Sequence, residues 1–169
     1  MAETTPITDL TLLEPCGAVR SRPEMMDYNG HLNVGWYGIL FEDAARAFFG
    51  RMDLSRDYCA RTARALFVTE QHQTFLAEIR EGEGLEVFVK IAGVTAKAVH
   101  VLYLMAKSAS GEIAAAQETL YLHVDHASRR VVAIDDTRLA RLSSIAARHQ
   151  NIGLPVAAGR AIVLRGVSP

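Results

Sequence analysis

Four residues that could do chemistry stand close together in the segment "DYNGHLN": Asp27, Gly30, His31 and Asn33. An aspartate carboxylate can take a proton from water or attack a carbonyl carbon itself. The first amides of a helix have no partner within that helix, so a helix starting here could bind a negatively charged oxygen. Taken alone, the segment favours a plain turn, because Asp and Asn form Asx turns and Asn-Gly is a common turn dipeptide. Its chemistry therefore depends on the surrounding elements.

The stretch after Asn33 predicts an amphipathic helix of roughly four turns. Polar Glu42, Asp43 and Arg46 lie on one half of its helical wheel. Asn33 is a suitable N-cap and Gly50 a suitable end. The apolar half carries Trp36, Tyr37, Leu40, Phe41, Ala44, Ala45 and Phe48. We therefore expect one face of this helix to be buried.

After an Arg-rich connection at 51–64, the periodicity becomes that of β-strands. Four runs rich in Val, Leu, Tyr, Phe and Thr follow, and the breaks "REGEG", "TAK" and "SASG" between them predict hairpin turns. These runs span residues 65–79, 85–94, 98–107 and 112–125. A short first strand is expected at 16–22, closed by Pro23, and a last helix at 136–150.

This order of elements predicts an α+β fold in which a long curved antiparallel sheet wraps the single long helix. We expect an N-terminal arm at residues 1–16, one domain at 17–150 and a C-terminal tail at 151–169. No internal repeat or second domain is indicated.

Composition restricts the partners. The 169 residues are 50% hydrophobic and 22% charged, and the net charge of −1 gives no electrostatic reason to expect nucleic acid or an anionic membrane. Cys16 and Cys59 have neither disulfide nor zinc spacing, and the acidic and hydroxyl residues at the start and the lack of an 18-residue apolar run lead us to expect neither a signal peptide nor a membrane-spanning helix. We expect a soluble cytoplasmic protein with no metal or other cofactor.

The motif D-x-x-G-H-x-N at 27–33, followed at once by the helix and the four strands, resembles the hot-dog-fold acyl-CoA thioesterases of the 4-hydroxybenzoyl-CoA thioesterase clade. The likeness runs over about residues 17–135, and "DYNGHLN" with "LYLHVDHASRRVV" is most similar to the betainyl-CoA thioesterases of carnitine breakdown. The resemblance implies a hot-dog fold and a homodimer or homotetramer with the active site at the dimer interface.

The same resemblance implies hydrolysis of a short or modest acyl-CoA, with coenzyme A as part of the substrate. Asp27 is then the catalytic carboxylate, as general base or nucleophile. The amide of Val34 polarises the carbonyl group, with Gly35 as the neighbouring candidate, while His31 and Asn33 have supporting roles.

Candidate substrate-binding residues lie around the motif and farther along the chain: Gly30, Gly35, Trp36, Tyr37, His72, Arg129 and Arg130. Trp36, Tyr37 or Tyr28 could face a trimethylammonium group through cation–π attraction, or could simply be core. Arg129 and Arg130 could meet coenzyme A phosphates, or could form a solvated surface turn.

Two other functions stay open: a non-catalytic acyl-CoA-binding protein, and a hot-dog hydratase or dehydratase. The hydratase pattern needs a proline where this motif has glycine. Glu42 could be a carboxylate of another thioesterase clade, but its spacing to Arg46 favours an ion pair. The segment "HVDH" could suggest a metal site formed by His123, Asp125 and His126. We interpret these as polar residues at the end of a strand, because no further ligand is spaced to join them.

Overall fold

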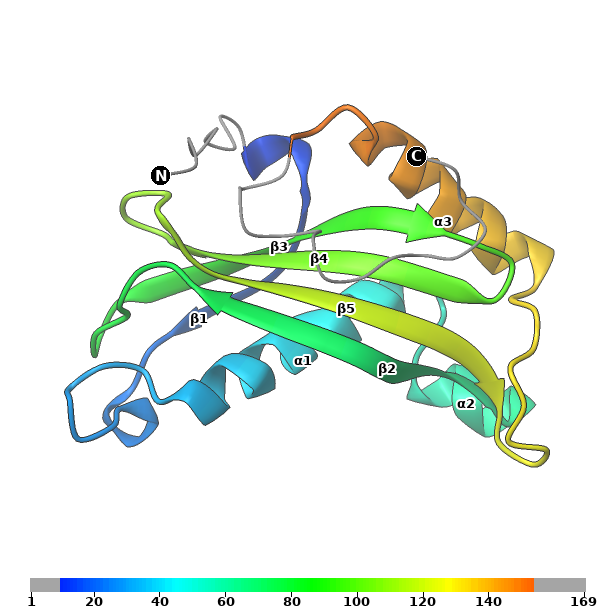
Figure 1. Cartoon of the computed structure of the whole chain (residues 1–169), viewed down its shortest axis with the longest axis horizontal. Helices are drawn as coiled ribbons and strands as arrows, with labels where there is room; N and C mark the ends of the chain where they lie inside the picture. The colour runs from blue at the N-terminus through cyan, green and yellow to red at the C-terminus, as the bar shows by residue number, and fades with distance from the viewer. Residues whose placement is uncertain (1–9, 154–169) are drawn as a thin grey trace.

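The computed structural model describes residues 10–153, which form a five-stranded antiparallel sheet with one long helix across one face (Figure 1). The strand order is β1-β3-β4-β5-β2. The strands are β1 (Glu14–Arg20), β2 (Arg64–Phe75), β3 (Gly84–Val94), β4 (Ala98–Lys107) and β5 (Ile113–Asp125); the helices are α1 (Val34–Arg51), α2 (Arg56–Thr62) and α3 (Asp136–His149), with single 3₁₀ turns at Leu10–Leu12 and Pro23–Met25. The α+β fold expected from the sequence is confirmed.

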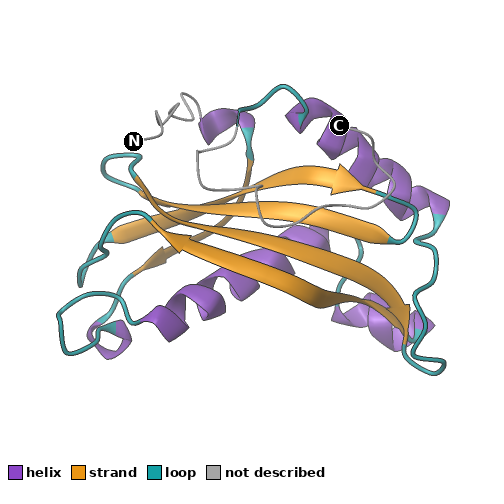
Figure 2. Ribbon diagram, viewed as in Figure 1, coloured by secondary structure: helices purple, strands orange, loops and turns teal. Residues whose placement is uncertain are grey.

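Helix α1 lies along one face of the sheet (Figure 2), and its side chains supply the centre of the core. Its buried side chains are Tyr37, Leu40, Phe41, Ala44, Ala45, Phe48 and Phe49, which confirms the predicted apolar face. Trp36 differs, since it is only partly buried at the edge of the core. Phe41 and Phe48 are 0% exposed. Burying a side chain of this size contributes roughly 1.5–3 kcal/mol, so this face is enough to hold the sheet on the helix.

Strand β3 alternates as expected for a strand with one more buried face, except that Lys90 on the other face is also buried. Leu85, Val87, Val89 and Ile91 are all at most 2% exposed and join the cluster formed by α1. The breaks "TAK" and "SASG" join strands that pair, β3 with β4 and β4 with β5.

The hairpin predicted at "REGEG" is wrong, because β2 pairs with β5 at the opposite edge of the sheet from β1. Gly82 has the positive φ of a turn, +80°, but turn chemistry does not specify which strand becomes the partner. After Phe75 the chain instead crosses from the β2 edge of the sheet to β3, which lies next to β1 near the opposite edge. On the way, Ile79 is fully buried and its carbonyl accepts a hydrogen bond from Leu32 N–H at 2.8 Å. The crossover thereby fixes residues 76–79 against the loop before α1.

Two element boundaries also differ from the sequence-based expectation. The connection predicted at 51–64 contains α2, capped by the Ser55 side chain and anchored by buried Tyr58. Seven residues are too few for a helical period to stand out. β1 begins at Glu14, two residues before the predicted strand.

Most of the expected N-terminal arm and C-terminal tail lies outside the described residues. Within 10–153, no helix is both long and apolar enough to cross a membrane.

Helix α3 packs beside β3. It covers the part of β3 that lies beyond the end of its pairing with β1. The pairing of β1 with β3 ends at Glu14 and Val89. Two residues farther along β3, the backbone N–H of Ile91 donates a hydrogen bond to Nδ1 of His149 at 3.0 Å. A histidine ring thus replaces the missing strand partner, and Leu142, fully buried, fixes the helix in place.

Candidate active site

A pocket of about 350 Å³ opens between the loop before α1, the first turn of α1 and the crossover after β2. It is lined by Asp27, His31, Leu32, Val34, Tyr37, Phe75, Leu76, Ala77 and Glu78. Residues far apart in the sequence meet here because the crossover runs alongside the loop.

The loop forms the turn that its sequence predicts, and Asp27 organises it. One carboxylate oxygen, Oδ1, accepts a hydrogen bond from Asn29 N–H at 2.8 Å, and the Asp27 carbonyl accepts one from Gly30 N–H at 3.0 Å. Gly30 has φ +77°, which explains the glycine. Among residues 10–153, nothing donates a hydrogen bond to the other oxygen, Oδ2. Asp27 therefore lines the pocket and shapes the turn with one oxygen, while the other oxygen is free of hydrogen bonds from the described residues.

The first turn of α1 leaves one amide unpaired. The Asn33 side chain caps the helix by accepting a hydrogen bond from Gly35 N–H at 2.9 Å, and the Asn33 carbonyl accepts one from Trp36 N–H. The N–H of Val34 has no acceptor in the described part of the chain, and Val34 lines the pocket. Of the two amides proposed from the sequence, Val34 is thus the available one, at the positive end of the helix dipole.

A second carboxylate, which the sequence analysis did not identify, reaches the same pocket. Glu78 Oε2 lies 2.9 Å from His31 Nε2, joining the crossover to the loop. Glu78 falls near the end of a predicted strand and has no local signal for a site, because only the crossover after β2 brings it to the loop.

Aromatic rings form one wall of the pocket. Tyr37 and Phe75 meet edge to face, with ring centroids 4.9 Å apart, and Phe75 remains 49% exposed. The pKa of the Tyr37 hydroxyl is raised, first by burial and then by the nearby negative charges of Asp27, Glu78 and Glu83. The wall thus lies in a negative electrostatic environment.

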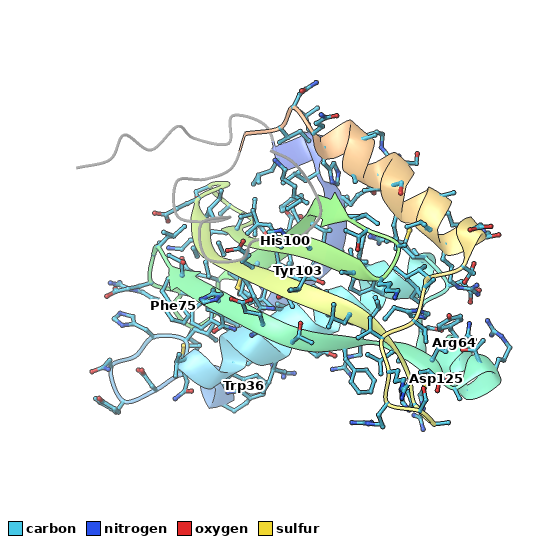
Figure 3. The ribbon with its side chains drawn as sticks, turned by 45° about the vertical axis from the view of Figure 1, so that its right-hand side comes forward. Trp36, Arg64, Phe75, His100, Tyr103 and Asp125 are labelled. Atoms are coloured by element: carbon cyan, nitrogen blue, oxygen red, sulfur yellow. The ribbon has the colours of Figure 1, made fainter. Side chains whose placement is uncertain are left out.

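Trp36 and Tyr28, the other aromatic candidates, are not among the lining residues. Tyr28 is 97% exposed, and Trp36 packs against the edge of the core. In Figure 3, Phe75 lies at the end of β2, and Trp36 lies on α1.

Three predicted substrate contacts lie away from this pocket. His72 is exposed on β2 and pairs with Glu70 at 3.0 Å. Arg129 follows β5, and its guanidinium carbon lies 5.2 Å from the centroid of the Phe67 ring. Arg130, the next residue, is exposed. The β5 end carrying Asp125 pairs with the start of β2, whereas the pocket lies at the β2 end near Phe75 (Figure 3). A strand of this length spans roughly 35 Å, so the arginines do not reach the pocket of their own subunit.

Other polar groups in the fold have structural partners. Glu42 pairs with Arg46 at 3.7 Å, which confirms the predicted ion pair. Both ring nitrogens of His123 are occupied, Nε2 by the Tyr58 hydroxyl at 2.9 Å and Nδ1 by the Val132 carbonyl at 3.1 Å. In the described part of the chain, no three His, Cys, Asp or Glu side chains are placed to hold a metal ion.

Comparison with known proteins agrees with this fold and defines a hot-dog-fold thioester hydrolase. The chain belongs to the thioesterase-like superfamily, whose family model matches residues 21–142.

Among curated proteins it is similar to a betainyl-CoA thioesterase from Pseudomonas aeruginosa, with 32% identity over 142 residues that cover 84% of this chain and 89% of the relative. A fused L-carnitine dehydrogenase/betainyl-CoA thioesterase from Rhizobium sp is 28% identical over 135 residues, covering 80% of this chain and 27% of that protein.

Two solved structures share the fold. A Staphylococcus aureus protein in complex with CoA has a TM-score of 0.82 at 23% identity, covering 90% of this chain and 96% of the other. A putative thioesterase from Pseudomonas putida has a TM-score of 0.75 at 28% identity, covering 90% and 97%.

Proposed function

We propose that this protein is an acyl-CoA thioesterase for a short or modest acyl group, such as betainyl-CoA. One observation carries the proposal: Asp27, which has a carboxylate, and Val34, whose amide is unpaired among the described residues, line the same pocket. The names of the curated relatives support the choice of substrate class. A volume of about 350 Å³ is near the small end of the range for ligand sites, which favours a short acyl group.

In this proposal, the thioester carbonyl oxygen accepts a hydrogen bond from Val34 N–H, so the amide stabilises the negative charge that grows on that oxygen. Oδ2 of Asp27 then takes a proton from water as the water oxygen bonds to the carbonyl carbon. The carbon–sulfur bond breaks, and coenzyme A leaves as a thiolate that takes up the proton.

A second route uses the same residues. Oδ2 of Asp27 attacks the carbonyl carbon, the thiolate leaves, and a mixed anhydride forms. Water then hydrolyses the anhydride and restores the carboxylate. Both routes give the acid and free coenzyme A, so the proposal includes either.

Two further residues have supporting roles. Asn33 occupies the Gly35 amide and so determines which N–H faces the substrate. The backbone N–H of His31 approaches Oδ1 of Asp27 at 3.5 Å, while its ring is held by Glu78. His31 therefore supports the orientation of the catalytic carboxylate.

We also propose a homo-oligomer, a dimer or a tetramer. β2 forms one edge of the sheet, and Val68 and Phe75 on this strand are 47% and 49% exposed. The outer edge of this 12-residue strand has no strand partner within residues 10–153, and an open edge with exposed apolar side chains favours pairing with a second copy. His72, Arg129 and Arg130 could then act toward another subunit's pocket.

The test is a panel of acyl-CoAs assayed for release of free thiol. Asp27→Asn should lower kcat/KM by about 100- to 10,000-fold, because the amide can neither accept a proton nor attack. Asp43→Asn is the matched control, since Asp43 is an exposed α1 carboxylate paired with Arg46 away from the pocket. Full activity in Asp27→Asn would remove this residue from its role, and binding of acyl-CoA without turnover by the wild type would favour a binding protein instead.

A further inference from the structure

We propose that the pocket selects an acyl group carrying a quaternary ammonium, that Glu78 recognises its positive charge, and that Tyr37 and Phe75 form the surface on which its methyl groups rest. This inference rests on the proposed thioesterase function, and it assigns specificity to residues separate from the carboxylate that does the chemistry.

A quaternary ammonium group has no N–H, so hydrogen bonds cannot recognise it. It is bound by aromatic rings within about 6 Å and by negative charge at van der Waals distance. The pocket offers both features. Tyr37 and Phe75 meet at a ring-centroid distance of 4.9 Å, and nearly half of Phe75 is exposed beside the pocket.

The charges around the pocket have the sign that a cation needs. Among the described residues, its lining includes Asp27, Glu78 and His31 but no Lys or Arg. The negative charges of Asp27, Glu78 and Glu83 also act together on the Tyr37 hydroxyl. A negatively charged acyl group would be repelled by the same arrangement, so the pocket discriminates by charge as well as by size.

Glu78 suits recognition better than Asp27 does. Asp27 is committed to the turn through Asn29 N–H and, in the proposed function, to the reaction. Glu78 stands on a crossover with a fixed backbone, since Ile79 is fully buried and its carbonyl is bonded to Leu32 N–H.

The His31 contact orients the Glu78 carboxylate. Oε2 lies 2.9 Å from Nε2 of the His31 ring. Glu78 is 64% exposed in its side chain, so its effect is screened by water and we expect a moderate contribution.

The experiment compares betainyl-CoA with 3,3-dimethylbutanoyl-CoA, which has the same shape but a neutral carbon in place of the nitrogen. The wild type should prefer the cationic substrate by about tenfold or more in kcat/KM. Glu78→Gln should reduce this ratio several-fold, mainly through KM for the cation, because the aromatic contacts remain. Any effect of this change on His31 acts on both substrates alike and cancels in the ratio. Phe75→Leu should reduce the ratio partly.

Glu70→Gln is the matched control, because Glu70 also pairs with a histidine, His72 at 3.0 Å, but lies outside the pocket. It should keep the wild-type ratio. Binding of free glycine betaine, measured by calorimetry, gives a readout that does not need turnover, and Glu78→Gln should weaken it several-fold.

Equal hydrolysis of both substrates by the wild type, or an unchanged ratio in Glu78→Gln, would overturn this inference while leaving the thioesterase proposal intact. Hydrolysis of other acyl-CoAs with no activity on either of this pair would do the same. Absence of thiol release from every acyl-CoA would instead contradict the proposed function. In that case, equal betaine binding by the wild type and Glu78→Gln would overturn the inference separately.

Discussion

The Asn33 side chain accepts a hydrogen bond from the backbone N–H of Gly35 at 2.9 Å, at the start of the helix that borders the pocket. This contact occupies one of the two amides that could polarise a substrate and leaves that of Val34. The N-cap thus has a structural role and, in the proposed mechanism, a role in the chemistry.

Substitutions of Asn33 should separate these two roles. Asn33→Ala loses the cap and should lower the free energy of unfolding by about 1 kcal/mol. Asn33→Asp keeps a good cap and should preserve stability, but it places a negative charge beside the developing oxyanion and should lower kcat by roughly tenfold. Urea denaturation and thiol release measure the two effects.

A cap remote from the pocket provides the control. Ser55 caps α2 by accepting a hydrogen bond from Asp57 N–H at 3.2 Å, so Ser55→Ala should lower stability with no change in kcat. If Asn33→Asp matched the wild type in both measurements, the first turn of α1 would not face the reacting carbonyl group.

Acid should weaken the contact between α3 and the sheet edge. His149 is fully buried, its Nδ1 accepts the Ile91 amide hydrogen, and its Nε2 has no hydrogen-bond partner within residues 10–153. The pKa of His149 is lowered, chiefly by burial, so folding favours the neutral ring.

The unfolded chain therefore binds this proton more readily than the folded protein does. The stabilisation is fully present above the unfolded pKa of about 6.5 and is lost as the pH falls below it toward the folded pKa. Urea denaturation from pH 7.5 to 5 should show a steeper loss of stability for the wild type than for His149→Gln. Equal slopes would mean that this histidine does not couple folding to pH.

The exposed edge strand predicts an assembly larger than one chain. Light scattering after size exclusion should give at least twice the 18.5 kDa of the monomer. Val68→Lys places a charge on the exposed part of β2 and should shift the population toward the monomer. A wild-type monomer at micromolar concentration would contradict the proposed oligomer.

Much of the fold could be predicted from local patterns. The period-two run from Leu85 to Ile91 and the cap at Asn33 both appear in the structure as expected, because each depends on neighbours along the chain. The pairing of β2 with β5 could not be predicted this way. Strand pairing at the edge of a sheet depends on contacts distant in sequence, and the turn residues around Gly82 fit a crossover as well as a hairpin.

The candidate site divides in the same manner. Asp27, His31 and Val34 lie on one continuous segment, so the motif could identify them together. Glu78 and Phe75 enter the pocket only through the crossover, and no local signal marked them. Arg129 and Arg130 were suggested by charge alone, which does not specify their end of the sheet.

The central claim is that a backbone N–H at the start of α1 stabilises the reacting carbonyl oxygen. Val34→Pro tests it directly, because proline removes only that hydrogen bond donor and is well tolerated at the first helical position. Asn33, with φ −62° and ψ 139°, already has the extended backbone preferred before proline. Val34→Ala, which keeps the N–H, controls for loss of the side chain.

The decisive measurement is kcat for thiol release by these two variants, after urea denaturation has shown that they have the same free energy of unfolding. The proposed mechanism predicts that Val34→Pro is roughly 100-fold or more below Val34→Ala. A value for Val34→Pro within about threefold of Val34→Ala would contradict it, because donors of this kind are worth far more than that factor.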